Sequence, residues 1–344
     1  MSVTLTNRLN LPQQLVDACL YDNHKTAGDI SCSQLIESPR VILLKRTNNT
    51  VEDVSDRMYM LMGTALHHIL ERANISNVKK RAFLLVHEHL ITEAKKLKDD
   101  KKREGMEKVA NYLMKVVPYF FPDLENRFLY EVTQRVQIGE KVLYGTPDLF
   151  DKTTGTLYDY KFCSVYSFIY PESRQKWEAQ TNVYAYLLTQ AGYEVKAIKI
   201  VAFFRDWSER SLTKNRDYPG SQVLEIDILL RTPIEMTNYV NKRMKMHNDA
   251  EETGILPFCT GRERWAEADD YAIKTPQAKK ALRVLPTKAE AEKWITDNKH
   301  KFDEMFIQYR PGMSKKCESF CSVKEFCSQY KSELEARRKA SDDN

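Results

Sequence analysis

No stretch of this chain could cross a membrane, because no apolar run approaches the ~20 residues that a membrane-spanning helix needs. The first residues, Met1 to Asn10, lack the basic start and the apolar stretch of a signal peptide. The sequence contains no internal repeat and no low-complexity tract. From these absences we expect a soluble protein of the cytoplasm that has no membrane partner.

A large excess of charge of one sign is also missing, since 53 basic and 48 acidic residues leave a net charge of only +5. Any surface that binds nucleic acid must therefore be local. The obvious basic runs, Lys79 to Arg81 and Lys95 to Arg103, are interpreted as solvated helix faces, with contacts to a nucleic-acid backbone as the alternative. A hydrophobic content of 42% over 344 residues is enough for a sizeable core.

Two carboxylates and an ammonium group are expected to meet on neighbouring strands. Residues 141–150 and 156–162 read as strands of a hairpin, which would return Asp159 to the neighbourhood of Asp148. Strand alternation then places Asp159 and Lys161 on one face. Two close carboxylates repel, so a hard cation such as Mg²⁺ or Mn²⁺ is the natural way to keep both ionised. Lys161 beside that cation could orient water or stabilise a transition state, as in a metal-dependent phosphodiesterase.

Two predicted helices add further polar groups at a spacing of four residues. Gly63 and His67 would share one helix face, so His67 could give an imidazole nitrogen to the same metal. His68 is the alternative to His67. Downstream, Gln180 and Tyr184 are again four apart, and could contact a DNA backbone or position Lys161.

Some residues have two interpretations. Glu131, in a predicted strand over 128–138, is interpreted as an ordinary strand surface residue, with a further metal-binding carboxylate as the alternative. Arg205 and Trp207 follow a predicted buried strand and could contact DNA by charge or by base stacking. They could equally anchor loops on the core, as could the segment Arg262 to Trp265.

The order of these motifs along residues 28–210 resembles the PD-(D/E)XK nuclease superfamily, and within it the RecB-like branch. The resemblance is carried by Gly63 with His67, Pro147-Asp148, Asp159-Tyr-Lys161, and Gln180 with Tyr184. It implies an α/β, restriction-endonuclease-like core with a mixed central β-sheet flanked by helices. It also implies divalent-metal catalysis, with DNA as the substrate.

The resemblance implies a role for each matching residue. It makes His67, Asp148, Asp159 and the backbone carbonyl of Tyr160 ligands of Mg²⁺ or Mn²⁺. Lys161 would be the catalytic lysine, acting with Asp148 and Asp159, and the branch-specific motif that binds or orients DNA would consist of Gln180 and Tyr184.

A second group of candidate ligands lies near the end of the chain, where Cys317, Cys321 and Cys327 fall within eleven residues. Such clustering without an export signal indicates a metal site rather than disulfides. Zinc or an iron–sulfur cluster would need a fourth ligand. Cys259, in a turn-like loop, is the first choice and Cys32 the alternative, while Cys19, Cys32 and Cys163 are otherwise read as ordinary thiols.

RecB-like relatives carry an iron–sulfur cluster whose last three cysteines follow the nuclease motifs. This resemblance favours a 4Fe–4S cluster, with Zn²⁺ as the alternative. The chain departs from the pattern before the Gly63 helix, where those relatives have Cys-Pro-Arg and this sequence reads Ser38-Pro39-Arg40.

The chain is expected to divide into four parts. These are an N-terminal cap segment (1–55), a nuclease core (56–253), a Cys-rich C-terminal subdomain (254–330) and a charged, frayed tail (331–344). Helices are predicted at 56–74, 78–98, 104–118 and 173–190, and further strands at 195–204 and 222–229. Capping boxes at Thr232 and Thr287 predict helices to about residue 250 and to about residue 298.

The predicted function is a metal-dependent DNA nuclease, an exonuclease acting on ends or single strands in recombination, repair or phage replication. The chain is similar to RecB-like nucleases of phages and prophages, so a bacterial host cytoplasm and a recombination or helicase partner are expected. The alternatives are a DNA-binding module without cleavage and a restriction-type endonuclease.

Overall fold

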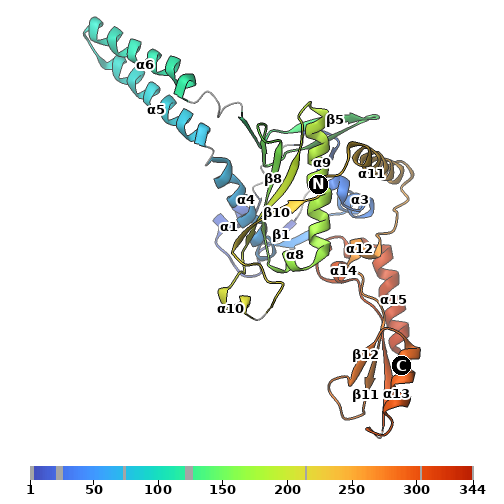
Figure 1. The fold of residues 1–344 in the computed structure, drawn as a ribbon. Helices are drawn as coiled ribbons and strands as arrows, with labels where there is room; N and C mark the ends of the chain where they lie inside the picture. The colour runs from blue at the N-terminus through green and yellow to red at the C-terminus, as the bar shows by residue number, and fades with distance from the viewer. Residues whose placement is uncertain are drawn as a thin grey trace. The chain divides into compact units, whose positions relative to one another are not determined.

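The computed structural model describes residues 4–20, 26–72, 75–120, 127–213, 215–302 and 304–342 (Figure 1). The chain forms two compact units. The first, here called the sheet unit, comprises Leu9–Ile36 and Val54–Met244. The second, here called the cysteine unit, comprises Met1–Arg8, Glu37–Asp53 and Lys245–Asn344.

A five-stranded sheet in the order β10-β9-β8-β7-β4 forms the centre of the sheet unit. Strands β8 and β9 run parallel, whereas the other neighbouring pairs are antiparallel. The sheet is therefore mixed, as predicted. Its strands are β4 (Phe128–Tyr130), β7 (Leu149–Asp151), β8 (Thr156–Cys163), β9 (Ala197–Phe204) and β10 (Val223–Ile228).

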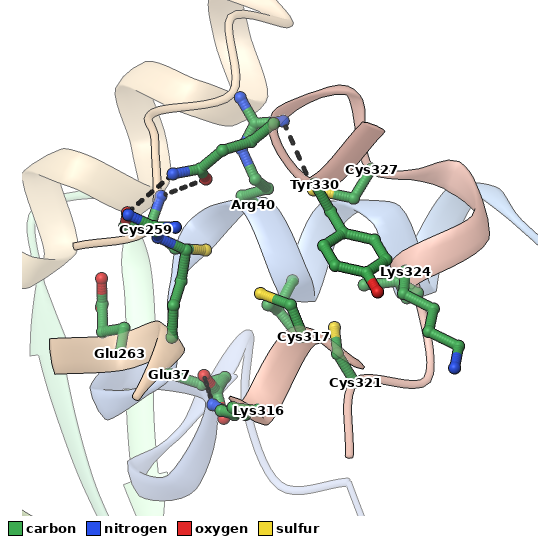
Figure 2. A pocket seen from close by; sticks show the side chains of 14 residues that line it. Glu37, Arg40, Cys259, Glu263, Lys316, Cys317, Cys321, Lys324, Cys327 and Tyr330 are labelled. Carbon is green, nitrogen blue, oxygen red and sulfur yellow. Dashed lines mark hydrogen bonds and ion pairs between the residues drawn. The ribbon is translucent and has the colours of Figure 1, made fainter. Parts of the chain in front are cut away.

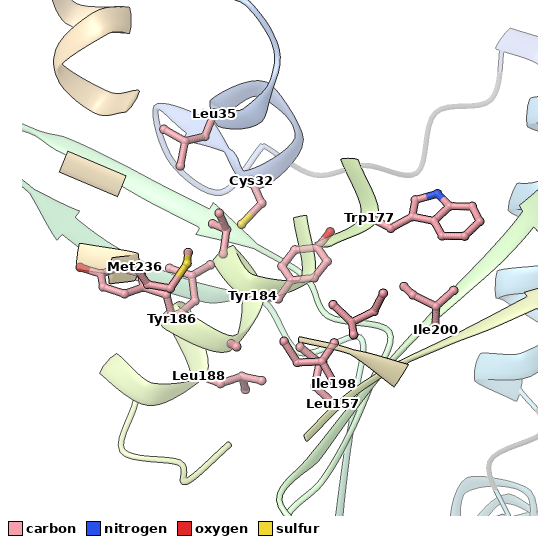
Figure 3. Packing of buried hydrophobic residues seen from close by; sticks show 14 of the residues in the cluster. Cys32, Leu35, Leu157, Trp177, Tyr184, Tyr186, Leu188, Ile198, Ile200 and Met236 are labelled. Atoms are coloured by element: carbon pink, nitrogen blue, oxygen red, sulfur yellow. The ribbon is translucent and has the colours of Figure 1, made fainter. Parts of the chain in front are cut away.

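The core of this unit lies between the sheet and helix α9 (Pro171–Gln190) (Figure 3). Every second residue of β9 is buried, from Ile198 to Phe204, because successive strand side chains point to opposite faces. Helix α9 contributes Trp177, Val183 and Leu187 to the same cluster. The predicted helix over 173–190 and the predicted buried strand are thus confirmed.

A second sheet in the order β2-β6-β5 consists of β2 (Ile30–Ser31), β6 (Lys141–Gly145) and β5 (Gln134–Ile138). The single strand predicted over 141–150 is therefore wrong, since β6 and β7 belong to different sheets. Pro147 in the break has no N–H to donate to a ladder. At Gly145 the backbone approaches the core so closely that a Cβ would lie 2.4 Å from Cys32 Sγ.

The strand predicted over 128–138 is interrupted as well. Glu131 adopts the left-handed backbone conformation, with φ of 47°, and this ends β4 before β5 begins.

The other helices of the sheet unit mostly agree with the predicted ranges. Helix α4 (Met58–Arg72) follows the 3₁₀ turn η1 (Val54–Arg57), and α5 and α6 pack on each other as a helical hairpin (Figure 1). The side chains of the basic run 79–81 lie outside the described residues. The bounds are α1 (Gln13–Leu20), α2 (Cys32–Ile36), α5 (Ile75–Lys96), α6 (Asp100–Phe120), α8 (Tyr166–Ile169), α10 (Glu209–Leu212) and α11 (Pro233–Thr253), the last of which continues into the cysteine unit.

The cysteine unit has a small core in which Val41 and Leu44 pack with Cys317, Val323 and Cys327. It also contains a parallel pair of short strands, β1 and β3. Its elements are β1 (Thr4–Thr6), α3 (Pro39–Thr47), β3 (Val51–Asp53), α12 (Gly261–Arg264), α14 (Lys315–Ser319), η2 (Lys324–Phe326) and α15 (Ser328–Asp342).

Helix α15 replaces the frayed tail predicted after residue 330. Tyr330 is buried in the small core and Leu334 packs against it. Glu333 forms an ion pair with Arg264 at 2.5 Å and accepts hydrogen bonds from Ser314. These contacts explain why a charged sequence remains helical through Asp342.

A separate α/β module lies between Cys259 and Cys317. It consists of β11 (Asp270–Lys274), β12 (Arg283–Leu285), α13 (Lys288–Asn298) and β13 (Phe306–Arg310), with the strands in the order β12-β11-β13. An antiparallel bridge between Ala266 and Ser314 returns the chain to its starting point. The sequence predicted only the helix of this module, whose capping threonine, Thr287, accepts a hydrogen bond from Glu290 N–H.

No helix among the described residues is long and apolar enough to span a bilayer.

Candidate active site

The two motif aspartates meet at the start of β7. Strand β7 pairs with β8 so that Leu149 lies opposite Tyr158, which brings Asp148 alongside the next residues of β8. The backbone N–H of Tyr160 donates a hydrogen bond to Asp148 Oδ2 at 2.6 Å. The hairpin between β7 and β8 therefore brings Asp159 close to Asp148, as the sequence predicted.

Asp159 is the buried carboxylate of this group, with only 2% of the residue exposed. The pKa of Asp159 is raised to about 6, mainly by burial and also by the nearby Asp148 charge, while Lys161 opposes both effects. Asp159 Oδ2 lies 2.6 Å from Lys161 Nζ, yet forms no hydrogen bond of good geometry with any described residue. The Lys161 ammonium group offsets part of this oxygen's loss of hydration, and a metal ion beside it would offset more.

His67 projects from α4 toward Asp148, and its Nδ1 atom lies 3.4 Å from Asp148 Oδ1. A hydrogen bond with Asp148 raises the pKa of the imidazole. His68 is instead paired with Glu71 at 3.5 Å, and both of those side chains are exposed. The structure thus brings His67, and not its neighbour, to the carboxylates.

Glu131, interpreted from the sequence as an ordinary strand surface residue with a metal-binding carboxylate as the alternative, completes this group. One ligand atom each of His67, Glu131 and Asp148 lies within 4.8 Å of the others. The N–H of Glu131 also donates to the Asp148 carbonyl at 3.1 Å. Its left-handed φ, which ends β4, is what takes the side chain out of strand alternation, and no residue spacing could have indicated this.

Lys161 is held by a short chain of polar side chains on α9. Its ammonium group donates to Gln180 Oε1 at 3.0 Å, and Gln180 Nε2 donates to the Tyr184 hydroxyl at 3.1 Å. Burial raises the pKa of Tyr184 well above its ordinary value, so the phenol stays neutral. The structure therefore brings Gln180 to Lys161 and places Tyr184 behind Gln180, four residues further along one helix face.

Four cysteines of the cysteine unit line one cavity (Figure 2). They are Cys259, Cys317, Cys321 and Cys327. Burial raises the pKa of Cys317 to about 12 and that of Cys259 above its ordinary value. Thiols in such apolar surroundings would ionise readily only beside a cation.

Arg40 fixes the loop that carries Cys259. It is buried and donates hydrogen bonds to the carbonyls of Leu256 and Pro257 at 2.6 and 3.0 Å. The Cys259 thiol donates to Ser38 Oγ at 3.2 Å.

Cys32 lies elsewhere, in the core of the sheet unit beside Tyr184 (Figure 3). Burial also raises the thiol pKa of Cys32 and of Cys163, the latter to about 11. These two cysteines pack as neutral thiols, and Cys19 is buried as well.

The residues that had two interpretations behave differently from one another. Trp207 anchors a loop, since its indole N–H donates to the Pro219 carbonyl at 2.8 Å. Trp265 packs against Phe320, with ring centroids 5.4 Å apart. Arg205 lies instead over the ring of Tyr59, an exposed tyrosine.

Comparison with curated proteins found no match. The solved structures to which the chain is similar include the following two. "Crystal structure of SSO0001" has 12% identity and a TM-score of 0.31, and covers 73% of this chain and 94% of that one. A phage-related exonuclease from Haemophilus somnus 129PT has 10% identity and a TM-score of 0.24, and covers 46% of this chain and 76% of that one.

The sequence profile of one protein family matches residues 35–328, a range that includes the strands of the central sheet, the group around Asp148 and all four cavity cysteines. The chain belongs to the PD-(D/E)XK nuclease superfamily.

Proposed function

We propose that this protein is a divalent-metal-dependent deoxyribonuclease that acts as an exonuclease, in a recombination, repair or phage replication process. The observation that carries the proposal is the convergence of His67, Glu131 and Asp148 within 4.8 Å. The buried Asp159–Lys161 pair next to them supplies a further carboxylate and an ammonium group. The RecB-like order of motifs supports the same interpretation.

The donor set fits the proposed metal. Carboxylate oxygens suit Mg²⁺ and Mn²⁺, and one imidazole nitrogen is compatible with Mn²⁺ in particular. His67, Asp148 and Asp159 would hold the ion, with Glu131 and the carbonyl of Tyr160 as further ligands. When bound, the ion would polarise a phosphoryl oxygen and lower the pKa of a coordinated water.

Lys161 would stabilise the negative charge that builds up on the scissile phosphate. Its ammonium group is fixed between Asp159 Oδ2 and Gln180 Oε1, so no reorganisation is needed when the charge develops. Tyr184 holds Gln180 in place and thereby orients the lysine.

For the cavity cysteines we propose a structural 4Fe–4S cluster, with Zn²⁺ as the alternative. Four thiols facing one cavity match the donor number of either site. The position of Cys32 in the sheet-unit core supports Cys259 as the fourth ligand. Iron and acid-labile sulfide analysis of anaerobically purified protein, beside zinc analysis, distinguishes the two.

The test of the nuclease function is cleavage of end-labelled linear and closed circular DNA, single- and double-stranded, with Mg²⁺, Mn²⁺ or EDTA. Metal-dependent loss of linear DNA alone is the expected result. Cutting of circles would replace the exonuclease proposal by an endonuclease. Binding without cleavage under all conditions would identify a DNA-binding module.

One observation favours the endonuclease as a second candidate. The α/β module between Cys259 and Cys317 has no cysteine and forms its own sheet, so the metal site does not occupy it. A target-recognition region would need such an independent element. The circular substrates decide between the two modes.

A further inference from the structure

Three exposed tyrosines lie close to the ends of β8 and β9. Tyr59, Tyr166 and Tyr170 are 59%, 63% and 56% exposed. The rings of Tyr166 and Tyr170 are stacked, with centroids 6.0 Å apart and an interplanar angle of 15°. The Arg205 guanidinium lies 3.9 Å from the centroid of the Tyr59 ring. These side chains thus form two stacked pairs, Tyr166 with Tyr170 and Arg205 with Tyr59.

These side chains are tied to the same strand ends that carry the proposed active site. The backbone N–H of Arg205 donates to the carbonyl of Cys163, the last residue of β8, at 3.0 Å. The Asp206 carboxylate accepts hydrogen bonds from Ser164 Oγ at 2.5 Å and from Val165 N–H at 2.7 Å. Tyr166 follows immediately, so its short helix is fixed to the loop after β9.

Tyr59 and His67 lie on the same face of helix α4. Tyr59, Gly63 and His67 are four residues apart, which places them in a row, with about 12 Å of helix axis between the first and the last. A Cβ added at Gly63 would meet no atom within 4 Å. The space over the middle of this row is therefore open.

The stacked pair is also within reach of the site. Tyr166 is five residues beyond Lys161, so their Cα atoms are separated by at most about 19 Å. Tyr170 caps the beginning of α9, the helix whose Gln180 holds Lys161.

We infer that Tyr59, Arg205, Tyr166 and Tyr170 form a stacking platform for the bases of single-stranded DNA entering the active site. This inference rests on the proposed nuclease function. Bases of a single strand expose flat faces that stack on tyrosine rings and on arginine planes. The positive charge of the Arg205 guanidinium group attracts the DNA phosphates. The open space over Gly63 leaves room for the single-stranded DNA to reach His67. Bases of a duplex are already stacked on one another, so the platform selects single strands.

The test is fluorescence anisotropy with a labelled single-stranded oligonucleotide and with its duplex. The full chain carries Lys161→Ala and Mg²⁺ is present, so that cleavage is slow while binding is measured. Tyr59→Ala and Tyr166→Ala should each weaken single-strand binding about ten-fold, which is the size of one lost base–aromatic stack. Tyr59→Phe and Tyr166→Phe should retain the affinity because they keep the ring.

Two further variants separate stacking from general effects. Tyr112→Ala removes a tyrosine of α6 that is 64% exposed, and it should leave the affinity unchanged. Gly63→Leu should weaken single-strand binding by obstructing the row, without lowering the melting temperature, because leucine is the better helix former.

Unchanged single-strand affinity in both alanine variants, or an equal loss for duplex and single strand, would overturn the platform. A failure of the nuclease proposal can be distinguished from a failure of the platform. If the protein with intact Lys161 cleaves nothing while the alanine variants still lose single-strand binding, the platform is supported and the nuclease activity is not.

Discussion

Opposite charges stabilise one another in the interior of the proposed site. The Asp159 side chain is 2% exposed and that of Lys161 is 20% exposed, and their charged atoms are 2.6 Å apart. Removal of one partner would leave the other charge buried without compensation. Variants of this pair must therefore be examined for folding as well as for activity.

Lys161→Ala should lower kcat for DNA cleavage by about 10²–10³-fold, because it removes a fixed positive group from the developing charge of the transition state. Circular dichroism and the melting temperature show whether the fold survives, since Asp159 loses its charged partner and would become protonated in compensation. Lys199→Ala is the matched control, since Lys199 lies on the neighbouring strand β9 and pairs with Glu225 outside the site. Equal cleavage by the Lys161→Ala variant and the unmodified protein would remove Lys161 from the mechanism.

Glu131→Gln should weaken Mn²⁺ binding at least about ten-fold, because the amide keeps the shape of the side chain but supplies no negative oxygen ligand. Isothermal titration calorimetry measures this directly, without DNA. Glu140→Gln changes an exposed glutamate after β5 and should leave the affinity unchanged. Identical Mn²⁺ affinities for the two variants would show that Glu131 is not a ligand.

Some residues of the proposed metal site could be predicted from the sequence, and others could not. The positions of Asp159 and Lys161 followed from strand alternation, and the faces of His67 and Gln180 followed from helical spacing. Glu131 was only the alternative, because a left-handed backbone conformation at a glutamate has no signature in residue spacing.

At the scale of elements, helices and long strands were easier to predict than short strands. Strand β9 has eight residues with a regular buried pattern and was recognised. Strands β7 and β12 have three residues each, too few for alternation to be distinguished from chance. The break between β6 and β7 depends on the close packing of Gly145 against Cys32, a contact between distant parts of the sequence.

The pairing of β4 with β7 has an electrostatic contribution that can be measured through pH. Arg127, directly before β4, forms an ion pair with Asp151 of β7 at 2.7 Å. The N–H of Thr153 donates to the same carboxylate at 2.9 Å. The guanidinium and these backbone bonds lower the pKa of Asp151 to about 2.

A carboxyl group whose pKa is lowered on folding stabilises the protein above its unfolded pKa, and this stability is lost as the pH falls through the folded value. We expect a contribution of roughly 1–2 kcal/mol at pH 7, discounted because Arg127 is partly exposed, that disappears between about pH 4 and pH 2. Urea unfolding of Asp151→Asn and the unmodified protein should differ at pH 7 and converge at low pH. Asp227→Asn, at a side chain 88% exposed, should change little at any pH. A constant difference for Asp151→Asn across this range would exclude the ion pair as its cause.

At the scale of the whole molecule, the motif order indicated the superfamily, but the sequence did not show how its end is built. The α/β module between Cys259 and Cys317 is an excursion of the chain. It begins after Ala266 and ends at Ser314, and these two residues are paired by an antiparallel bridge. Its strands are short and its charges are mixed, so composition alone could not separate it from the cysteine-bearing loops. The three clustered cysteines were visible as a pattern, whereas the position of Cys259 beside them required the folded chain.

The cysteine unit has a small core, and four of the residues in or against it are the cavity cysteines. A bound metal centre would cross-link α14, η2 and the Cys259 loop, and would therefore stabilise this unit in particular. Cys259→Ser should lower the iron content and reduce the melting temperature by at least about 5 °C. Cys19→Ser alters a buried cysteine of the sheet unit, so it should retain the metal whatever its effect on stability. Full iron or zinc content in Cys259→Ser would show that this residue is not the fourth ligand.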